Sequence, residues 1–245
     1  MKKQIYTLSA NVPVAPGVYR LELVADGAAP LRCGQFVQVA VPGKYLRRPL
    51  SVSLSEPGRL TLLYKVVGEG TAALAALQEG AQLELLTGLG NGFHVEACRE
   101  KALLIGGGIG VAPLHQLCRD LRAAGKEVTA ILGFNTAAEI LLHQELTSLG
   151  AEVHLATLDG SAGMKGLVTD ALKQLAPTYD YFYVCGPMPM MRALYPLLPG
   201  PGEYSLEERM GCGTGVCFGC TIATTEGPQR ICHEGPVFPK SLLPW

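Results

Sequence analysis

The stretch ALLIGGGIGVAPL, residues 102–114, begins as a continuous apolar run and changes at Gly106 into a glycine-rich segment. A short apolar run bounded by glycine is typical of a buried strand. Residues 106–110 predict a turn, and residues 111–124 predict a helix, because Pro113 lies in its first turn and Gly125 follows its end. This order of strand, turn and helix is the repeating unit of an α/β domain.

The same order recurs after this stretch. Each repeat joins an apolar run to a segment of helical pattern: residues 128–132 with 137–149, residues 153–156 with 167–176, and residues 181–184 with 188–197. Consecutive units of this kind place their strands in an open parallel sheet, with a nucleotide crevice at the carboxyl ends of the strands. We therefore expect a parallel-sheet α/β domain over residues 99–200.

Residues 1–98 follow a different pattern. Short runs, often of alternating apolar and polar residues, are separated by glycine and proline at 18–23, 35–39, 60–64 and 82–85. This spacing predicts a small antiparallel β-barrel, interrupted by one helix over residues 70–77 that Gly80 ends. The expected fold class is thus a β-barrel followed by an α/β domain.

Four cysteines near the C-terminus stand in the order C-x4-C-x2-C-x11-C, namely Cys212, Cys217, Cys220 and Cys232. Three thiolates on one glycine-rich loop and a fourth from outside it form a ligand set for a [2Fe–2S] cluster. Structural zinc, which usually takes two short cysteine pairs, and disulfides, which need an oxidising compartment, are the alternatives. Because a proline and glycine linker occupies residues 199–202, we expect a small cluster module over residues 201–245.

The composition limits the class of protein. The chain has 245 residues, of which 48% are hydrophobic and 17% charged, and its formal net charge is −1. That length accommodates two compact domains and a small module. There is no basic tract for nucleic acid, and no apolar stretch predicts a membrane span or a signal peptide. We expect a cytoplasmic protein without nucleic-acid or membrane partners.

The glycine turn of the first α/β unit is a candidate nucleotide site. Backbone N–H groups at the start of a helix can hold a pyrophosphate, and Gly106, Gly107, Gly108 and Gly110 would let it approach. The glycines do not match G-x-G-x-x-G, and a tight connection between strand and helix is the alternative. No arginine or lysine occupies residues 133–136, where a 2′-phosphate would lie, which favours NAD over NADP.

Cys185 is the candidate catalytic residue. The segment Cys185-Gly186-Pro187 follows the last apolar run of the α/β domain and so reaches the same carboxyl edge as the glycine turn. A lone cysteine at such a place is more often a small buried apolar side chain. Its position beside the crevice makes it a candidate neighbour of a bound nicotinamide.

The expected barrel contains two candidate anion sites. In Arg47-Arg48-Pro49-Leu50-Ser51, an arginine offers a bidentate fork to phosphate, and the serine can hydrogen-bond a ring heteroatom of a flavin. The segment GEGT, residues 68–71, begins a helix whose amides offer a second phosphate contact. Adjacent arginines alone more often form a solvated edge. Two anion sites on one barrel favour a bound cofactor.

In the order RPLS, GT, GGGIGVAPL, CGP and terminal cysteine loop, the chain resembles the ferredoxin reductase family of flavoproteins. Within that family, SLEERMGCGTGVCFGC (205–220) and CHEGPVF (232–238) are similar to the electron-transfer subunits of type B dihydroorotate dehydrogenases. The resemblance covers nearly the whole chain, and the cysteine loop is its most specific part. Residues 88–93, GLGNGF, also fit, although Thr87 and Gly88 replace an expected Gly-Pro.

The resemblance implies FAD on the barrel, NAD on the α/β domain and a [2Fe–2S] cluster that faces a partner. That partner is an FMN-containing catalytic subunit that oxidises dihydroorotate in pyrimidine biosynthesis, in an assembly of two catalytic and two electron-transfer subunits. Electrons would pass from FMN through the cluster and FAD to NAD+. The implied flavin contacts are Arg48, Pro49, Leu50, Ser51, Lys65, Val66, Val67, Gly70 and Thr71.

Other interpretations stay open at this level. The chain is also compatible with the flavin and iron–sulfur subunit of a ferredoxin:NAD(P) oxidoreductase, a sulfide dehydrogenase or a hydrogenase. A flavin-binding regulator with a redox-sensing cluster represents a different class. The apolar residues Val216, Phe218 and Ile222 either cover the cluster at a partner interface or pack against the chain's own domains.

Overall fold

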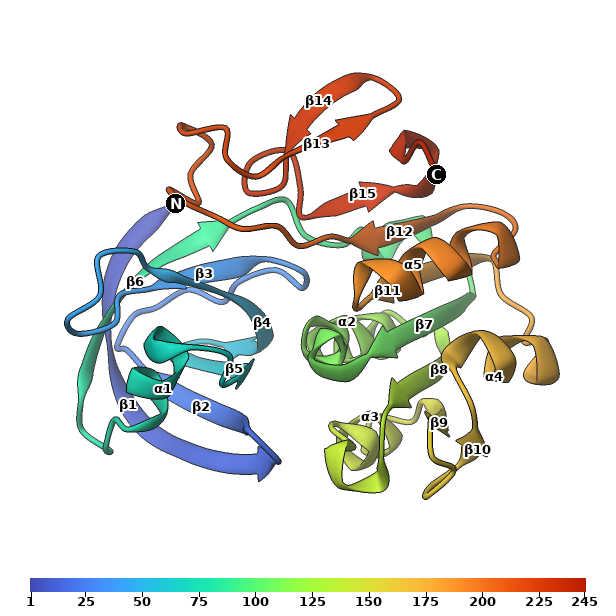
Figure 1. Ribbon diagram of the computed structural model, residues 1–245, viewed down its shortest axis with the longest axis horizontal. Helices are drawn as coiled ribbons and strands as arrows, with labels where there is room; N and C mark the ends of the chain where they lie inside the picture. Colours follow the sequence, from blue (N-terminus) through green and yellow to red (C-terminus); the bar gives the residue numbers. More distant parts are fainter.

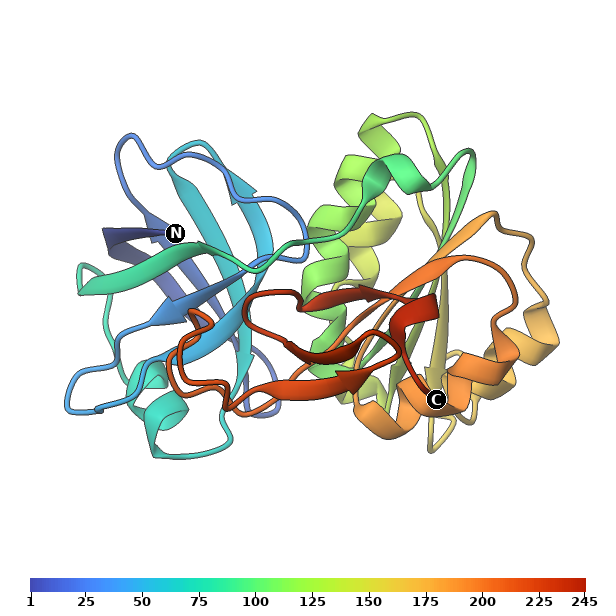
Figure 2. The ribbon, with the colours of Figure 1, turned by 90° about the horizontal axis from the view of Figure 1, so that it is seen from above.

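The structure, a computed structural model, describes residues 1–245. It contains a closed antiparallel barrel, a seven-stranded sheet and a two-stranded hairpin. The barrel and the helix-covered sheet lie side by side, and the C-terminal segment extends across the junction between them (Figures 1 and 2). None of the helices combines the length and the apolar composition that crossing a membrane requires. The predicted fold class is confirmed.

The barrel has the strand order β1-β2-β5-β4-β3-β6, and β6 closes it by pairing with β1. Every neighbouring pair is antiparallel. Its strands are β1 (Lys2–Ala15), β2 (Val18–Val24), β3 (Phe36–Val39), β4 (Arg48–Glu56), β5 (Arg59–Lys65) and β6 (Gln82–Leu89). Its core contains alternate apolar residues of these strands, among them Leu21, Leu23, Val37, Val39 and Leu62. The helix α1 (Glu69–Ala75) adds Leu74 to this core.

The second sheet has the order β10-β9-β8-β7-β11-β12-β15, with all neighbours parallel except β15, which runs antiparallel to β12. Its strands are β7 (Lys101–Gly107), β8 (Glu127–Phe134), β9 (Glu152–Thr157), β10 (Met164–Lys165), β11 (Tyr181–Cys185), β12 (Gly202–Ser205) and β15 (Val237–Pro239). The hairpin consists of β13 (Thr221–Thr224) and β14 (Gly227–Arg230).

Helices cover both faces of this sheet. Alternate residues of β7 separate the two faces, since Leu104 packs with α2 (Ala112–Ala123) and α3 (His143–Ser148), whereas Leu103 packs with α4 (Val168–Leu175) and α5 (Met188–Leu194). Short 3-10 helices complete the chain: η1 (Val95–Ala97), η2 (Gly108–Val111), η3 (Ala137–Glu139), η4 (Tyr195–Leu197) and η5 (Lys240–Leu242). Coverage on both faces is what a buried parallel sheet requires.

Helix α2 fixes the α/β domain against the barrel. Gln116 donates a hydrogen bond from Nε2 to the backbone oxygen of Leu31 at 2.7 Å, and Arg119 donates one to the backbone oxygen of Ser55 at 3.3 Å. His115 Nδ1 lies 3.4 Å from the hydroxyl of Ser53, which is fully buried. These contacts hold the glycine turn before α2 beside strand β4.

Two local predictions differ from the structure. The helix expected over 137–149 is broken into η3 and α3, because Leu142 adopts a left-handed conformation with φ of 60° at the residue before α3. The segment 199–202, expected to be a linker, leads straight into β12, which hydrogen-bonds to β11. The edge strand of a sheet has unpaired backbone N–H and C=O groups. A segment that follows closely in the sequence can therefore pair with it as a further strand.

Candidate functional site

The four cysteines of the C-terminal loop are surrounded by backbone N–H groups. Cys212 Sγ accepts hydrogen bonds from the amides of Thr214 and Cys217, each at 3.4 Å. Each of the other three sulfurs accepts one such hydrogen bond. The amide of Gly219 donates to Cys217 Sγ at 3.5 Å, that of Cys232 to Cys220 Sγ at 3.4 Å, and that of Gly215 to Cys232 Sγ at 3.1 Å. Amide donors to sulfur stabilise negative charge on a ligated cluster. The loop is therefore suited to hold an iron–sulfur cluster.

The cysteines differ in burial and in acidity. Cys217 is exposed, whereas Cys220 and Cys232 are buried. Burial opposes ionisation of Cys212, but the amides of Thr214 and Cys217 outweigh it and lower the pKa of this thiol to about 6. Burial, reinforced by the neighbouring Cys220, raises the pKa of Cys232 to about 12. One side of the site thus faces outward, and the other lies within the protein.

The donor set fits a two-iron cluster better than the alternatives. All eight cysteines are free thiols, so the loop is not closed by disulfides. The C-x4-C-x2-C run also differs from the two short cysteine pairs that structural zinc usually takes. Hydrogen bonds from backbone amides join the cysteines in two pairs. The N–H of Cys217 donates to Cys212 Sγ, and the N–H of Cys232 donates to Cys220 Sγ. A [2Fe–2S] cluster takes its ligands as two pairs, one on each iron.

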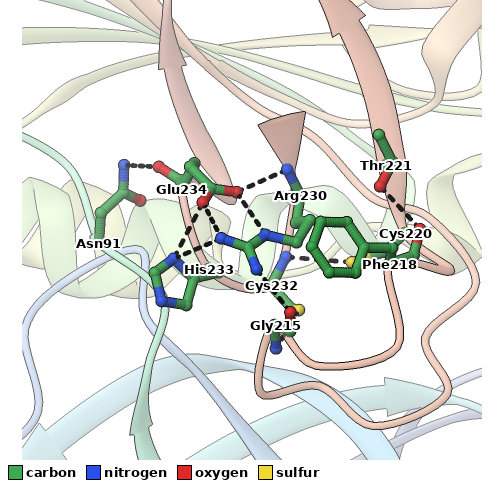
Figure 3. A network of polar contacts seen from close by, with 9 residues as sticks. All are labelled: Asn91, Gly215, Phe218, Cys220, Thr221, Arg230, Cys232, His233 and Glu234. Carbon is green, nitrogen blue, oxygen red and sulfur yellow. Dashed lines mark hydrogen bonds and ion pairs between the residues drawn. The ribbon is translucent and has the colours of Figure 1, made fainter. Parts of the chain in front are cut away.

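Arg230 ties the loop to the rest of the chain (Figure 3). It donates from Nη1 to the backbone oxygen of Gly215 at 2.6 Å and from Nε to the carboxylate of Glu234 at 3.0 Å. Its guanidinium carbon lies 4.7 Å from the centre of the Phe218 ring. Asn91 donates to the backbone oxygen of Glu234 at 2.9 Å and so connects this network to the segment that follows β6. The cluster loop is thereby held against the barrel.

The two adjacent arginines of the barrel have different partners. Arg47 is ion-paired with Glu84 and also donates to its backbone oxygen. Arg48 has no carboxylate partner and donates to the backbone oxygen of Leu46. Its guanidinium lies directly on Gly70, where an added Cβ would come within 2.1 Å of Nε. Arg48 is therefore the arginine whose charge is free for an anion beside α1.

The remaining predicted flavin residues lie around Arg48. Thr71 orders the segment before α1, because its hydroxyl accepts hydrogen bonds from the amides of Val67 at 2.9 Å and Gly68 at 3.2 Å. Lys65 and Val67 are exposed, and Val66 is half-buried. Pro49 and Ser51 lie opposite Gln38 and Phe36 in the register of β3 and β4, all partly or fully buried. Leu50 packs instead against the barrel core.

The glycine turn and the Cys-Gly-Pro segment meet at the carboxyl edge of the sheet. A Cβ on Gly110 would lie 2.6 Å from Gly186 Cα and 2.8 Å from the backbone oxygen of Cys185. A Cβ on Gly107 would lie 2.5 Å from Met190 Sδ, whereas Gly108, with φ of 54°, has open space around it. Gly106 is packed against Val111 and Leu114. Only glycine permits the close approach at Gly107 and Gly110, and the open space beside the half-buried Gly108 fits a bound pyrophosphate.

Cys185 is buried at the end of β11, beside Gly110. Burial raises the pKa of its thiol to about 12, although a hydrogen bond with Ser205 acts in the opposite direction. A neutral thiol is not a nucleophile at physiological pH. The geometry therefore presents Cys185 as a buried, neutral side chain beside the glycine turn.

The exposed apolar residues of the loop separate into two groups. Val216 is 77% and Phe218 63% exposed, and one face of the Phe218 ring contacts the Arg230 guanidinium. Ile222 is half-buried and packs against the hydrophobic cluster that contains Cys220 and Cys232. Ile222 therefore packs within the chain, and Val216 and Phe218 are left largely exposed.

Several residues of the site lack a local sequence signal. Asn91 lies in the GLGNGF stretch, which the family resemblance had singled out, but its partners Glu234 and Val237 are far along the chain. Arg230 and Gln38 belong to no motif. The sequence alone offers no sign of these two positions, because Arg230 meets Gly215 and Phe218 only in the folded loop and Gln38 meets Gly213 only where the barrel and the loop come together.

Comparison with known proteins agrees with this geometry. The family model for the iron–sulfur cluster binding domain of dihydroorotate dehydrogenase B matches residues 207–243, and the oxidoreductase NAD-binding domain matches residues 104–195. The electron transfer subunit of dihydroorotate dehydrogenase B (NAD(+)) of Lysinibacillus sphaericus is 43% identical, with 94% of each chain covered. The subunit of the same description from Fusobacterium nucleatum is 36% identical, with 97% of each chain covered.

A solved structure supports the same arrangement. It is described as an NADH-dependent reduced ferredoxin-NADP oxidoreductase, is 30% identical, covers 99% of this chain and 90% of its own, and superimposes with a TM-score of 0.89. These comparisons confirm the predicted cofactor set of FAD, a [2Fe–2S] cluster and NAD. They favour the dihydroorotate dehydrogenase interpretation over the other flavin and iron–sulfur subunits. The chain belongs to the family of electron transfer subunits of dihydroorotate dehydrogenase B (NAD(+)).

Proposed function

We propose that this chain passes electrons from the FMN of a dihydroorotate-oxidising catalytic subunit through a [2Fe–2S] cluster and FAD to NAD+, in pyrimidine biosynthesis. One observation carries the proposal: four cysteine sulfurs, each with an amide donor, line a loop that is exposed at Cys217 and buried at Cys220 and Cys232. A site open on one side and continuous with the protein interior on the other suits transfer between a partner and an internal acceptor.

We divide the chain into an FAD-binding barrel over residues 1–98, an NAD-binding domain over 99–200 and a cluster module over 201–245. When bound, the cluster supplies single-electron transfer and FAD converts electron pairs into a hydride for NAD+. What supports the division is the change from the closed barrel to the parallel sheet after β6, and the position of all four cluster cysteines after β12. Strands β12 and β15 fasten the module to the neighbouring sheet.

Within the barrel, Arg48 balances the charge of the FAD phosphates. The support for this role is that Arg48 has no carboxylate partner and lies on Gly70. The other residues assigned to the flavin are Pro49, Leu50, Ser51, Lys65, Val66, Val67, Gly70 and Thr71. Thr71 keeps the turn before α1 in place, and Ser51 offers its hydroxyl to the flavin ring.

Within the α/β domain, Gly106, Gly107, Gly108 and Gly110 present backbone amides to the NAD pyrophosphate. Cys185 lies next to this turn as a neutral thiol, and we assign it a packing contact with the nicotinamide. A small, uncharged side chain leaves room for the ring and excludes water from it.

We assign docking of the catalytic subunit to the surface around Cys217, with Val216 and Phe218 as apolar contacts. Their exposure of 77% and 63% supports this, because large apolar side chains beside a ligand loop are otherwise costly to leave in water. We propose an assembly of two catalytic and two electron transfer subunits, located in the cytoplasm.

The test is reconstitution with the catalytic subunit that copurifies with the tagged chain. The complex should reduce NAD+ with dihydroorotate, and the isolated chain should oxidise NADH only with an artificial dye. If anaerobically purified protein contained zinc but no iron or labile sulfide, the assignment of the cluster would be wrong. NADH oxidation without any dihydroorotate-dependent activity in the complex would favour a different flavin and iron–sulfur enzyme.

A further inference from the structure

Gln38 is the one side chain with two buried polar atoms that have no hydrogen-bond partner. Neither Nε2 nor Oε1 has a hydrogen bond in the protein, and the residue is 0% exposed. A buried amide without partners costs free energy, and native proteins rarely tolerate one without a reason. The position of Gln38 therefore calls for a partner that is not part of the chain.

The register of the barrel places Gln38 on its outer face. Its neighbours Val37 and Val39 belong to the barrel core, and successive side chains of a strand point to opposite faces. Phe36, on the same face as Gln38, packs in the hydrophobic cluster that contains Cys220 and Cys232. Gln38 thus points from the barrel toward the cluster module.

The cluster loop lies directly on the Gln38 amide. An added Cβ on Gly213 would come within 2.1 Å of Nε2 and 2.8 Å of the amide carbon, and Gly213 has φ of 68°. Gly213 follows Cys212, one of the four predicted ligands. On the other side, Gln38 lies opposite Pro49 in the register of β3 and β4, within the segment assigned to the flavin. The amide is therefore located between the flavin segment and the cluster loop.

We propose that the Nε2–H group of Gln38 donates a hydrogen bond to a sulfur of the bound [2Fe–2S] cluster on its Cys212 side. This inference rests on the proposed function, because it requires the cluster. The backbone amides already reach all four cysteine sulfurs, and Gln38 adds a side-chain donor from the barrel. Donors to sulfur stabilise the more negative reduced state, so Gln38 raises the reduction potential of the cluster.

The test compares Gln38→Met with the wild type. Methionine is nearly isosteric and lacks a polar hydrogen, and Gln38→Leu repeats the test with a different shape. Gln116→Met is the matched control, since Gln116 is also buried with an unpartnered Oε1 but belongs to α2, where its Nε2 bonds the backbone oxygen of Leu31. The full chain, loaded with FAD and the cluster, is titrated anaerobically and followed by electron paramagnetic resonance.

At a fixed ambient potential, Gln38→Met should lower the ratio of reduced to oxidised cluster about tenfold, which corresponds to a shift of about 59 mV for a one-electron couple. The control should leave this ratio unchanged. The apoprotein of Gln38→Met should unfold at the same temperature as the wild type or higher, because the chain loses no hydrogen bond.

Three results would overturn the inference. These are an unchanged ratio in both Gln38 variants with full cluster content, a shift confined to the flavin couple, and an equal shift in the Gln116 control. Failure of the proposed function has a different signature, since the wild-type protein would then lack iron and labile sulfide.

Discussion

Replacing Arg48 with alanine should weaken FAD binding far more than the same change at Arg47. The two arginines are adjacent on the chain but differ in their partners. Arg47 is ion-paired with Glu84, which also contacts Lys3, whereas Arg48 has no carboxylate partner. An arginine already neutralised by a carboxylate contributes little to binding another anion, so Arg47→Ala is the matched control.

The expected magnitude follows from the contact that is lost. Arg48 lies against Gly70 at the start of α1, where a phosphate would approach both the guanidinium and the backbone amides. A charge-assisted hydrogen bond contributes about 1.5–3 kcal/mol, which corresponds to roughly a 10- to 100-fold increase in the dissociation constant of FAD. Folding should change little, because the only bond that Arg48 makes within the chain is to a backbone oxygen of an exposed loop.

The assay is equilibrium binding of FAD to the apoprotein, followed by quenching of flavin fluorescence. Gly70→Ala provides a second variant, since its Cβ would displace the Arg48 guanidinium without removing the charge. We expect its affinity to lie between those of Arg48→Ala and the wild type. Equal affinities of Arg47→Ala and Arg48→Ala for FAD would refute the assignment of Arg48 as the phosphate ligand.

Three further predictions concern the cluster, the partner and pH. Cys217→Ser should abolish the visible iron–sulfur absorbance and the dihydroorotate-dependent reduction of NAD+ by the complex, because a hydroxyl is a poor substitute for a thiolate ligand; retained absorbance would contradict the ligand assignment. Phe218→Asp should reduce dihydroorotate-dependent activity at least tenfold more than NADH oxidation by a dye, since the charge is placed at the proposed interface; equal loss of both activities would indicate a role within the chain. Burial lowers the pKa of His115 below its ordinary value of 6.5, so its contribution to stability is present above pH 6.5 and is lost as the pH falls through the lowered pKa. Thermal unfolding of the apoprotein should therefore show a smaller loss of stability between pH 7.5 and about pH 5 in His115→Gln than in the wild type, and parallel curves would argue against this titration.

Much of the fold follows from local sequence patterns. The apolar run and glycine turn at 102–114 correctly predict β7 and α2, since strand burial, proline position and a terminal glycine all act within a few residues. The spacing of the four cysteines likewise predicts one ligand loop, and in the structure each of these sulfurs accepts a hydrogen bond from a backbone amide. The break at Leu142 was not predicted, because its left-handed conformation has no glycine or asparagine to signal it.

The relation between the sites was decided by tertiary structure. Nothing near Arg47 and Arg48 in the sequence indicates that Glu84 neutralises only Arg47. Arg47 directly precedes β4 and Glu84 lies in β6, and the barrel brings these two strands to either side of β3. Two contacts join residues that are more than a hundred positions apart in the sequence: Asn91 with Glu234, and Gln38 with Gly213. Periodicity and ligand spacing describe neighbours along the chain, whereas contacts between the barrel and the cluster loop depend on how separate hydrophobic surfaces pack. The sequence by itself therefore determined which cofactor chemistry this chain carries, and packing decided which side chains connect the cofactor sites.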